Sequence, residues 1–498
     1  MADPLFIAVD LGAGSGRVFI CGVGPDELFL EEVRRFQYPP IERSGVLRWD
    51  FVHILAEIKL GLRSAGDRAR QLHRSIQSIG VDSWGVDYGF LDADGVLIND
   101  PACYRDDRTL SAVDEVFERV PRSEIFENTG IQFQCFNTLF QLYSENGDIH
   151  SAAKFLLLPD LINYFLTGTA AGEYTNVTTT QMYNAVSGTW DRGLLERLDL
   201  PIEILPEIIP AGTNIGPLRS EIGDEVGLSG INVVAPGTHD TASAVAAAPL
   251  DNGSAFISSG TWSLIGVENK NAIVNAAVEK QNFTNEGGVY GTIRFLKNVM
   301  GLWIFESCRR EWKASGIDVE YDTILRDVEA ANGNQAFIFP DDERFLNPPK
   351  MLNAITQQLK DTGQKLDDAP AAISRMIFDS LALRYASVLK SIGSLTGRAI
   401  DNIQILGGGG RNRYLNQMTA NASGLRVRSG LVEATVVGNV LVQAIHSGRF
   451  ASLAEARKHV FDNQIFEEYL PVTSPNLVEA IQRYSEIESR FTDRGESL

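Results

Sequence analysis

The chain has 498 residues, a length that favours two or more domains over a single core. Its formal net charge of −20 argues against nucleic-acid binding, so an anionic ligand must be held by backbone amides, a metal and a few local cations. The four cysteines are widely spaced and no run of ~18 apolar residues is present, so we expect a cytoplasmic protein without a signal peptide, disulfides, structural zinc or a membrane partner.

The N-terminus shows a strand–turn–strand pattern around a group of glycines. A β-prone stretch, 6–10, ends in Asp10, and Gly12 to Gly16 precede a second β-prone stretch, 18–21. Small residues let backbone N–H groups approach a phosphate, and an acid beside such a turn can hold Mg²⁺ through waters. The simpler alternative is that Asp10 bonds the adjacent turn. A dinucleotide fingerprint is disfavoured because Arg17 replaces the third glycine and no helix follows, and there is no Walker A loop.

The following segments alternate between helical and strand-like patterns. We expect a helix over 52–72, a strand over 79–90, helices over 139–145 and 151–166, and a short strand over 232–235. Within the second of these, Asp82, Trp84 and Asp87 surround Gly85. A Trp beside carboxylates suits a sugar, which has one apolar face and many hydroxyls, although a core Trp beside surface acids explains the spacing equally well.

Residues 249–253 (Pro-Leu-Asp-Asn-Gly) mark a predicted domain boundary, with domains over 1–248 and 249–455 and a C-terminal tail over 456–498 whose helix packs on the body. Just after the boundary, the strand–turn–strand plan recurs around Ser259, Gly260 and Thr261, which indicates a second phosphate-binding hairpin. Further on we expect helices over 370–395, from about 414, over 434–446 and over 476–491, and a strand over 402–406. That strand runs into Gly407 to Gly410, which is either a tight turn or a wall of a nucleotide site.

Thr238, His239, Asp240 and Thr241 precede an alanine-rich helix. The simple interpretation is that Asp240 or Thr238 caps this helix. The alternative is that Asp240 accepts a hydroxyl proton as a general base and His239 contacts a substrate. The segment alone does not separate these two interpretations.

Taken together, these segments resemble the FGGY carbohydrate kinases and, within that family, the branch that acts on L-rhamnulose. The resemblance covers nearly the whole chain. Besides the N-terminal hairpin, it rests on 82–87, 104–106, 130–138, 173–181, 239–245, 258–264 and 296–303. It implies an α/β fold of the two-domain actin-like ATPase (ribonuclease H-like) type, with nucleotide and sugar in the cleft between the domains.

The resemblance also implies a reaction, transfer of the ATP γ-phosphate to the carbon-1 hydroxyl of L-rhamnulose, with Mg²⁺. By resemblance, Asp240 is the catalytic base and Asp10 organises the metal. The implied sugar contacts are Gly85, His239, Asp240, Thr241 and Asn298, and the implied nucleotide contacts are Ala13, Gly14, Ser15, Gly16, Arg17, Thr261, Glu306 and Gly408. Glu306 departs from the Gln expected there.

Two alternatives stay open at this stage. One is a kinase for a related ketose such as L-fuculose or xylulose. The other is a non-catalytic actin-like protein, either a regulator or a chaperone, against which the acidic charge and the Trp and acid cluster argue. We expect only small-molecule partners, a ketose and ATP, and a monomer or weak dimer.

Overall fold

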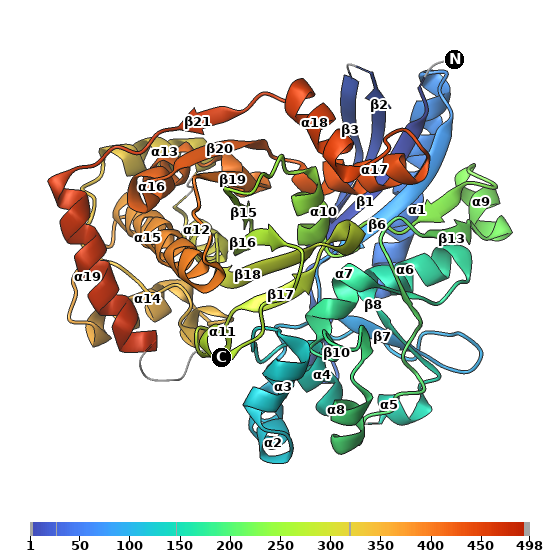
Figure 1. Cartoon of the computed structure of the whole chain (residues 1–498), viewed down its shortest axis with the longest axis horizontal. Coiled ribbons are helices and arrows are strands. Elements are labelled where there is room, and N and C mark those ends of the chain that lie inside the picture. Colours follow the sequence, from blue (N-terminus) through green and yellow to red (C-terminus); the bar gives the residue numbers. More distant parts are fainter. Residues whose placement is uncertain (1–2, 26, 146, 318–319, 493–498) are drawn as a thin grey trace. The chain divides into compact units, whose positions relative to one another are not determined.

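The computed structural model describes residues 3–25, 27–145, 147–317 and 320–492, and it divides the chain into two compact units (Figure 1). Unit 1 comprises Met1–Pro249, Glu268–Phe295 and Glu433–Gln464, and unit 2 comprises Leu250–Val267, Leu296–Val432 and Ile465–Leu498. The chain therefore returns to unit 1 twice after the first 249 residues.

Unit 1 is built on a six-stranded mixed sheet with the order β13-β14-β6-β1-β2-β3. The central strand β1 pairs antiparallel with β2 and parallel with β6. The strands of this unit are β1 (Leu5–Gly12), β2 (Ser15–Gly24), β3 (Glu27–Gln37), β4 (Ile41–Arg43), β5 (Val46–Arg48), β6 (Ile76–Ser83), β7 (Tyr88–Leu91), β8 (Lys154–Leu157), β9 (Gly172–Glu173), β10 (Tyr183–Asn184), β11 (Thr189–Trp190), β12 (Ile208–Ile209), β13 (Asn214–Pro217), β14 (Asn232–Val234) and β17 (Thr284–Gly287).

Helices pack on both faces of this sheet, as its buried strands require. Gly61 of α1 lies against Val18 on one face, whereas Gly80 lies against Asn439 of α17 on the other. The helices of the unit are α1 (Phe51–Gln71), α2 (Ala112–Arg119), α3 (Arg122–Thr129), α4 (Thr138–Tyr143), α5 (Asp148–Ser151), α6 (Leu158–Thr167), α7 (Tyr174–Val177), α8 (Arg192–Arg197), α9 (Ser220–Val226), α10 (Asp240–Ala247), α11 (Ala276–Lys280), α17 (Ala434–His446) and α18 (Leu453–Asn463). Since side chains alternate along a strand, Asp10 and Asp82 lie on the α17 face with Gly80.

Unit 2 contains a second mixed sheet, in which β18, β16, β15, β19, β20 and β21 follow one another in that order. β15 pairs antiparallel with β16 and parallel with β19, so the predicted second hairpin is confirmed. The elements are β15 (Ser254–Ser259), β16 (Trp262–Asn269), β18 (Ile293–Met300), β19 (Asn402–Leu406), β20 (Arg426–Leu431), β21 (Glu467–Tyr469), α12 (Trp303–Ala314), α13 (Tyr321–Ala330), α14 (Met351–Asp361), α15 (Pro370–Thr396), α16 (Arg413–Ser423) and α19 (Pro475–Thr492). β16 and β18 each continue into unit 1.

The C-terminal helix α19 packs through one apolar face onto unit 2. Ala480, Tyr484 and Ile487 of this helix form a buried cluster with Phe337, Phe339 and Leu383. Arg384 of α15 adds a buried ion pair to Glu488 of α19. Within unit 2, α19 is thus held by both apolar packing and charge.

The structure corrects two predicted elements. The expected strand over 79–90 is two strands, β6 and β7, because Val86 adopts a φ of +70° that no strand can contain. The expected helix over 151–166 begins only at Leu158, since 154–157 form β8, which pairs antiparallel with β7. Apolar runs of this length do not separate a buried strand from a helix.

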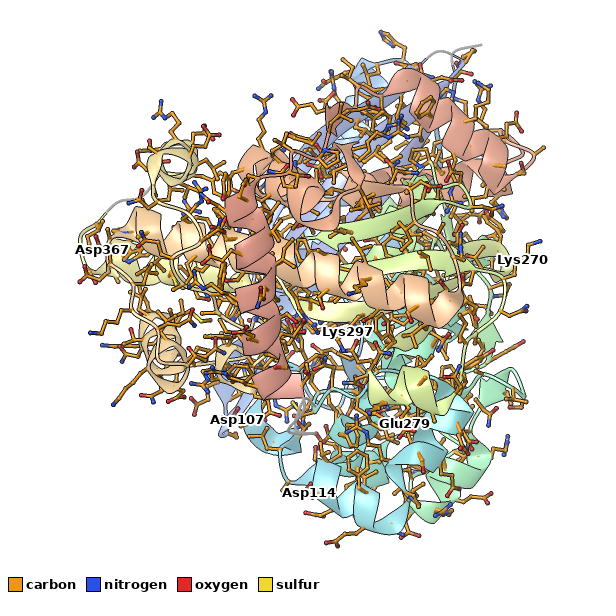
Figure 2. All side chains as sticks on the ribbon, turned by 60° about the vertical axis from the view of Figure 1, so that its left-hand side comes forward. Asp107, Asp114, Lys270, Glu279, Lys297 and Asp367 are labelled. Atoms are coloured by element: carbon orange, nitrogen blue, oxygen red, sulfur yellow. The ribbon has the colours of Figure 1, made fainter. Side chains whose placement is uncertain are left out.

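The acidic charge of the chain lies largely at the surface. Asp107 and Asp114 in unit 1 and Asp367 in unit 2 are exposed acids, labelled in Figure 2. In the part of the chain that the structure describes, no helix is both long and apolar enough to span a membrane.

Candidate functional site

Four charged groups meet at the β1–β2 hairpin of unit 1. The strand register pairs Asp10 with Arg17 on one side and with Asp82 on the other. Asp10 forms an ion pair with Arg17, whose guanidinium also contacts Glu433 just before α17. Asp82 is fully buried and accepts a hydrogen bond from the Asn439 amide at 2.6 Å. Burial, and then the nearby Asp10 charge, raise the pKa of Asp82 well above its ordinary value.

The turn of this hairpin has the geometry of an open cradle. Gly14 adopts a φ of +126°, and a Cβ there would meet no atom within 4 Å. The Tyr38 hydroxyl lies 2.7 Å from the carbonyl oxygen of Gly12 and 2.9 Å from that of Ser15, so its hydrogen is donated to the backbone of the turn. Because β2 follows the glycines directly, the dinucleotide-fingerprint alternative is excluded.

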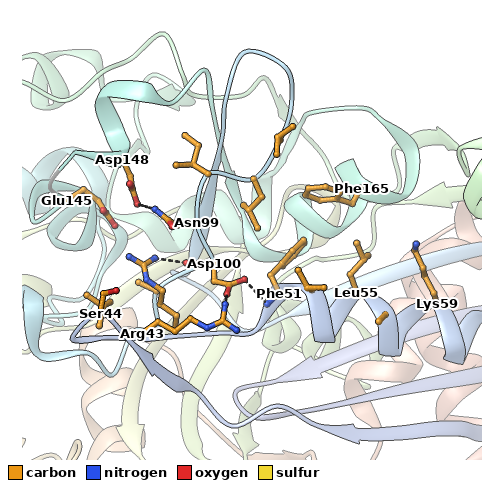
Figure 3. A pocket seen from close by; sticks show the side chains of 18 of the residues that line it. Arg43, Ser44, Phe51, Leu55, Lys59, Asn99, Asp100, Glu145, Asp148 and Phe165 are labelled. Carbon is orange, nitrogen blue, oxygen red and sulfur yellow. Dashed lines mark hydrogen bonds and ion pairs between the residues drawn. The ribbon is translucent and has the colours of Figure 1, made fainter.

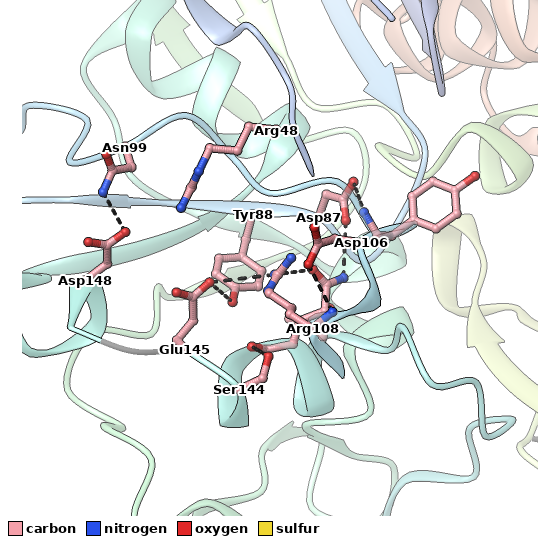
Figure 4. Close-up of polar contacts among 12 residues, drawn as sticks. Arg48, Asp87, Tyr88, Asn99, Asp106, Arg108, Ser144, Glu145 and Asp148 are labelled. Carbon is pink, nitrogen blue, oxygen red and sulfur yellow. Dashed lines mark hydrogen bonds and ion pairs between the residues drawn. The ribbon is translucent and has the colours of Figure 1, made fainter. Parts of the chain in front are cut away.

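Trp84 is held in place by a buried carboxylate. Asp87 accepts hydrogen bonds from the indole nitrogens of Trp49 at 2.7 Å and Trp84 at 2.9 Å. Burial raises the pKa of Asp87 to about 6, although these hydrogen bonds oppose the shift. Figure 4 shows Asp87 near a second polar group in which Arg108 and Tyr88 both contact Glu145. Asp87 is therefore a buried hydrogen-bond partner of Trp84 and not a surface acid.

Gly85 lies directly beside His239. A Cβ at position 85 would come within 3.0 Å of the Thr179 hydroxyl and 3.1 Å of the His239 ring. Gly85 and His239 lie close because the segments that precede them are hydrogen-bonded: the Ser83 amide donates to the Thr238 carbonyl at 2.9 Å. A larger residue at position 85 would thus fill the space between Thr179 and His239.

Asp240 is the first residue of α10, and its carboxylate does not cap the helix. The cap position is His239, whose side chain makes no capping hydrogen bond. Asp240 accepts hydrogen bonds from the amide and hydroxyl of the adjacent Thr241. Burial and the Asp10 charge raise the pKa of Asp240 to about 7. A carboxyl with that pKa can exchange a proton near neutral pH, as a general base must.

Three charged residues beside His239 were not identified from sequence. Glu173 accepts hydrogen bonds from the amide and hydroxyl of Thr238, both at 2.9 Å. Glu286 of β17 and Arg294 of β18 form a buried ion pair at 3.0 Å. The signal for Arg294 was a cation within the apolar stretch 293–296, and the signal for Glu286 was weaker because glycines follow it.

Unit 2 gathers its predicted residues around the second hairpin. The Gly301 and Trp303 amides donate to the carbonyl of Thr261, at 3.1 and 3.2 Å. A Cβ at Gly409 would lie only 2.0 Å from the Ser259 hydroxyl, whereas one at Gly408 would meet nothing within 4 Å. The run Gly407 to Gly410 therefore packs on the hairpin through Gly409, whereas no atom lies near the position of a Cβ at Gly408.

The other two residues predicted in unit 2 flank this hairpin. Asn298 lies on β18, half-buried. Glu306 lies in the first turn of α12, where its carboxylate pairs with Arg309 at 2.8 Å.

No cluster of three or more His, Cys, Asp or Glu side chains suited to a metal occurs in the described residues. An all-protein metal cage is therefore not part of this fold as described. The donor set at the hairpin, one carboxylate beside a turn of small residues, suits a hydrated cation that arrives on a nucleotide, since Mg²⁺ keeps most of its waters.

A further concavity of unit 1, of about 1160 Å³, contains none of these residues (Figure 3). It lies along α1 and the loop that contains Asn99 and Asp100. Two of its basic side chains form ion pairs, Arg43 with Asp100 and Lys59 with Glu225, and Arg48 and Arg63 donate to backbone carbonyls. These pairs leave little free positive charge for an anion.

Comparison with known proteins matches each half of the chain to a domain of one protein family. The model of the FGGY family of carbohydrate kinases, N-terminal domain, matches residues 5–247, and the C-terminal domain model of the same family matches 255–447. A curated protein from Bacteroides thetaiotaomicron named rhamnulokinase is 41% identical over 94% of this chain and 96% of its own length. A Bacillus subtilis protein of the same name is 36% identical over 96% of this chain and 98% of its own.

Solved structures agree on the fold. A ligand-bound xylulose kinase from Lactobacillus acidophilus superposes with a TM-score of 0.78 at 15% identity, covering 99% of this chain and 98% of that one. Plasmodium falciparum glycerol kinase with ADP gives a TM-score of 0.76 at 13% identity, covering 99% of each chain. The predicted two-domain actin-like ATPase fold is confirmed, and the chain belongs to the FGGY family of carbohydrate kinases.

Proposed function

We propose that this kinase transfers the γ-phosphate of ATP to the carbon-1 hydroxyl of L-rhamnulose. The observation that carries the proposal is the similarity, at 35–41% identity over more than nine-tenths of the chain, to curated proteins named rhamnulokinase. A kinase for a neighbouring ketose, such as L-fuculose or xylulose, is the second candidate. The likeness to xylulose kinase structures, at 15–17% identity, supports the fold and not that substrate.

The proposed roles in unit 1 follow from the geometry around Asp240. Its carboxylate is the base that takes the proton from the attacking hydroxyl, since its side chain is 33% exposed and, among the described residues, accepts hydrogen bonds only from the neighbouring Thr241. His239 and Thr241 are the proposed sugar contacts beside it, and Gly85, whose missing Cβ lets the His239 ring pack closely against it, is a further one. Asn298 of unit 2 is the further proposed sugar contact.

The nucleotide roles are assigned to the two hairpins and the glycine run. Backbone amides of Ala13 to Gly16 and the Arg17 side chain contact phosphates, and Thr261, Gly408 and Glu306 are the proposed contacts in unit 2. Asp10 orients waters of Mg²⁺, and that ion, when bound with ATP, offsets negative charge on the phosphates. Backbone donors held in place by the fold stabilise charge that develops during transfer.

The hairpin proposal predicts the effect of Tyr38→Phe. The phenol is fully buried near Asp10, Asp82 and Asp240, and burial followed by these charges raises its pKa well above the ordinary value, so it stays a donor. Losing the hydrogen bond that its single hydroxyl hydrogen donates to the turn should raise KM for ATP about fivefold to tenfold, because such a bond contributes about 1 kcal/mol.

KM for the ketose should change less than twofold or so in the same variant, since the sugar contacts are untouched. Tyr88→Phe is the matched control, because Tyr88 donates to Glu145 at 3.0 Å, away from the hairpin. Equal effects of the two variants on KM for ATP would contradict the role of Tyr38.

The Asp240 assignment predicts an acid limb in the pH profile. Because the base must be ionised and its pKa is raised to about 7, kcat/KM should fall as the pH drops below 7. The decline in kcat/KM should approach about tenfold per pH unit. Its midpoint gives the pKa of the base in the free enzyme. A profile that stays flat from pH 5.5 to 8 would remove Asp240 from this role.

A ketose panel tests the substrate. Rates of ADP formation are compared for L-rhamnulose, L-fuculose and D-xylulose at concentrations well below KM, so that they report kcat/KM. We expect L-rhamnulose to exceed the others by at least about tenfold, a difference of 1.4 kcal/mol in transition-state binding. Preference for another ketose would replace the proposed substrate but leave the kinase assignment intact.

We also propose that the protein acts in the cytoplasm, where ATP is supplied, as a monomer or weak dimer. Light scattering coupled to size-exclusion chromatography reads the mass directly: a species near 54.6 kDa that grows only at high concentration is expected.

A further inference from the structure

His239 lies between two carboxylates. Its Nε2 is 3.7 Å from an Asp240 oxygen, and its Nδ1 is 3.9 Å from a Glu286 oxygen. The ring is nearly buried, with 10% of its side chain exposed. Two acids at this distance would ordinarily favour the protonated, positively charged imidazolium. Such an ion would pair with Asp240 and lower its ability to accept a proton.

Arg294 supplies a cation on the far side of Glu286. Its side chain is fully buried, its Nη1 lies 3.0 Å from the same Glu286 oxygen, and its Nε donates to the Gly287 carbonyl at 2.9 Å. Within the part of the chain that the structure describes, its two terminal nitrogens make no hydrogen bond. Arg294 therefore acts on its surroundings mainly through its charge, and the acid nearest to it is Glu286.

The remaining ionisable groups around this cluster are few. Glu173 and Tyr174 also face Arg294, and Glu173 connects to His239 through Thr238 and Thr175. On the other side, Asp10 and Asp82 face Asp240, and Arg17 offsets the charge of Asp10. Arg294 is the cation of this group that forms an ion pair with Glu286.

We propose that Arg294 is a positioning residue that keeps His239 neutral by balancing the charge of Glu286, and so leaves Asp240 free to act as the base. The proposal rests on the function proposed above, because it gives Asp240 that role. A neutral imidazole has one donor and one acceptor nitrogen, whereas an imidazolium has donors alone, so a neutral His239 does not form an ion pair with Asp240. The directions of the shifts agree: burial, then Arg294, depress the pKa of His239 well below its usual range.

Nitrogen-15 NMR of the histidine-labelled protein reads the charge of His239 directly. The chain has six histidines, and the His239→Gln variant identifies the resonance. In the wild type, the His239 ring nitrogens should show neutral shifts throughout pH 5.5–8.5, where an ordinary histidine titrates near about 6.5. A wild-type His239 that is protonated at pH 6 would overturn the proposal without any variant.

The Arg294→Gln variant removes the cation and leaves Glu286 facing His239. Its His239 should then titrate within pH 5.5–8.5, and kcat at pH 6 should fall about tenfold or more while recovering partly at pH 8.5. The matched Arg294→Lys variant keeps a charge and should keep His239 neutral. A His239 that stays neutral in Arg294→Gln would contradict the proposal.

A double variant, Arg294→Gln with Glu286→Gln, removes both charges. It avoids a buried unpaired carboxylate, which could prevent the single variant from folding. Its His239 should be neutral again, although both ends of the ion pair are lost. A purely structural ion pair would instead make the double variant resemble the single one. Since NMR reports charge and not turnover, the result stands even if L-rhamnulose proves to be the wrong substrate.

Discussion

Replacing Asp240 with Asn should lower kcat by a factor of ~10²–10⁴, the usual effect of losing a general base. Asn retains the shape and one oxygen that can accept from the Thr241 amide, as Asp240 does. It cannot take the sugar proton. Because the pKa of the half-buried wild-type carboxyl is raised to about 7, its charged form is disfavoured in the fold, and an uncharged amide should leave the melting temperature unchanged or slightly higher. Steady-state kinetics and thermal unfolding of the same preparation check both.

Asp191→Asn is the matched control for this prediction. Asp191 caps α8 by accepting from the Leu194 amide at 3.0 Å, and Asn caps about as well as Asp. Its kcat should match the wild type. If Asp240→Asn were equally harmless, the proton acceptor would have to be another group and the central role given to α10 would fail.

Gly438→Ala should be the most destabilising small substitution in unit 1. A Cβ at Gly438 of α17 would lie 1.7 Å from the Ser243 carbonyl oxygen of α10, so the two helices would have to separate. The gain in helix propensity is about 1 kcal/mol. Forcing a methyl group into so close a contact between backbones should exceed it, for a net loss of about 3 kcal/mol or more.

The same substitution should reduce activity, because α10 carries Asp240 at its first position and α17 carries Asn439, which contacts Asp82. Chemical denaturation measures the loss of stability. Gly193→Ala is the control: it is also a helical glycine of unit 1, but its Cβ would find only an Asp191 oxygen at 3.7 Å. It should be neutral or slightly stabilising, and a stable Gly438→Ala protein would show that the helices can shift apart.

Much of the fold could be predicted from local patterns in the sequence. The strand–turn–strand pattern around the first glycines and near Ser259 predicted one hairpin in each of the two mixed sheets. The helix α17 occupies the predicted range 434–446. The two wrong predictions, for 79–90 and 151–166, concern segments whose structure depends on contacts with distant parts of the chain. A break at Val86 depends on a left-handed residue that its side chain does not favour, and β8 forms a strand only because β7 lies beside it.

The site was partly predictable for a related reason. Asp10 and Asp240 stand out in the sequence because each is an acid next to apolar or small residues that should be buried. Tyr38, Glu286 and Arg294 do not, since their importance comes from partners far away in the chain. Tyr38 reaches back to Gly12 and Ser15, and Glu286 and Arg294 meet His239 only because β17 and β18 return to unit 1. Beyond the position of Arg294 as a cation in the apolar stretch 293–296, the local sequence gives no sign of these contacts.

The central claim, transfer of phosphate from ATP to the carbon-1 hydroxyl of L-rhamnulose, is tested most directly by identifying the product. L-rhamnulose, MgATP and the enzyme are incubated to completion, and phosphorus-31 and carbon-13 NMR locate the new ester. The account predicts one ADP for each sugar phosphate and a phosphorus coupling to carbon 1 alone. ADP formed without sugar phosphate, or an ester at another carbon, would contradict it.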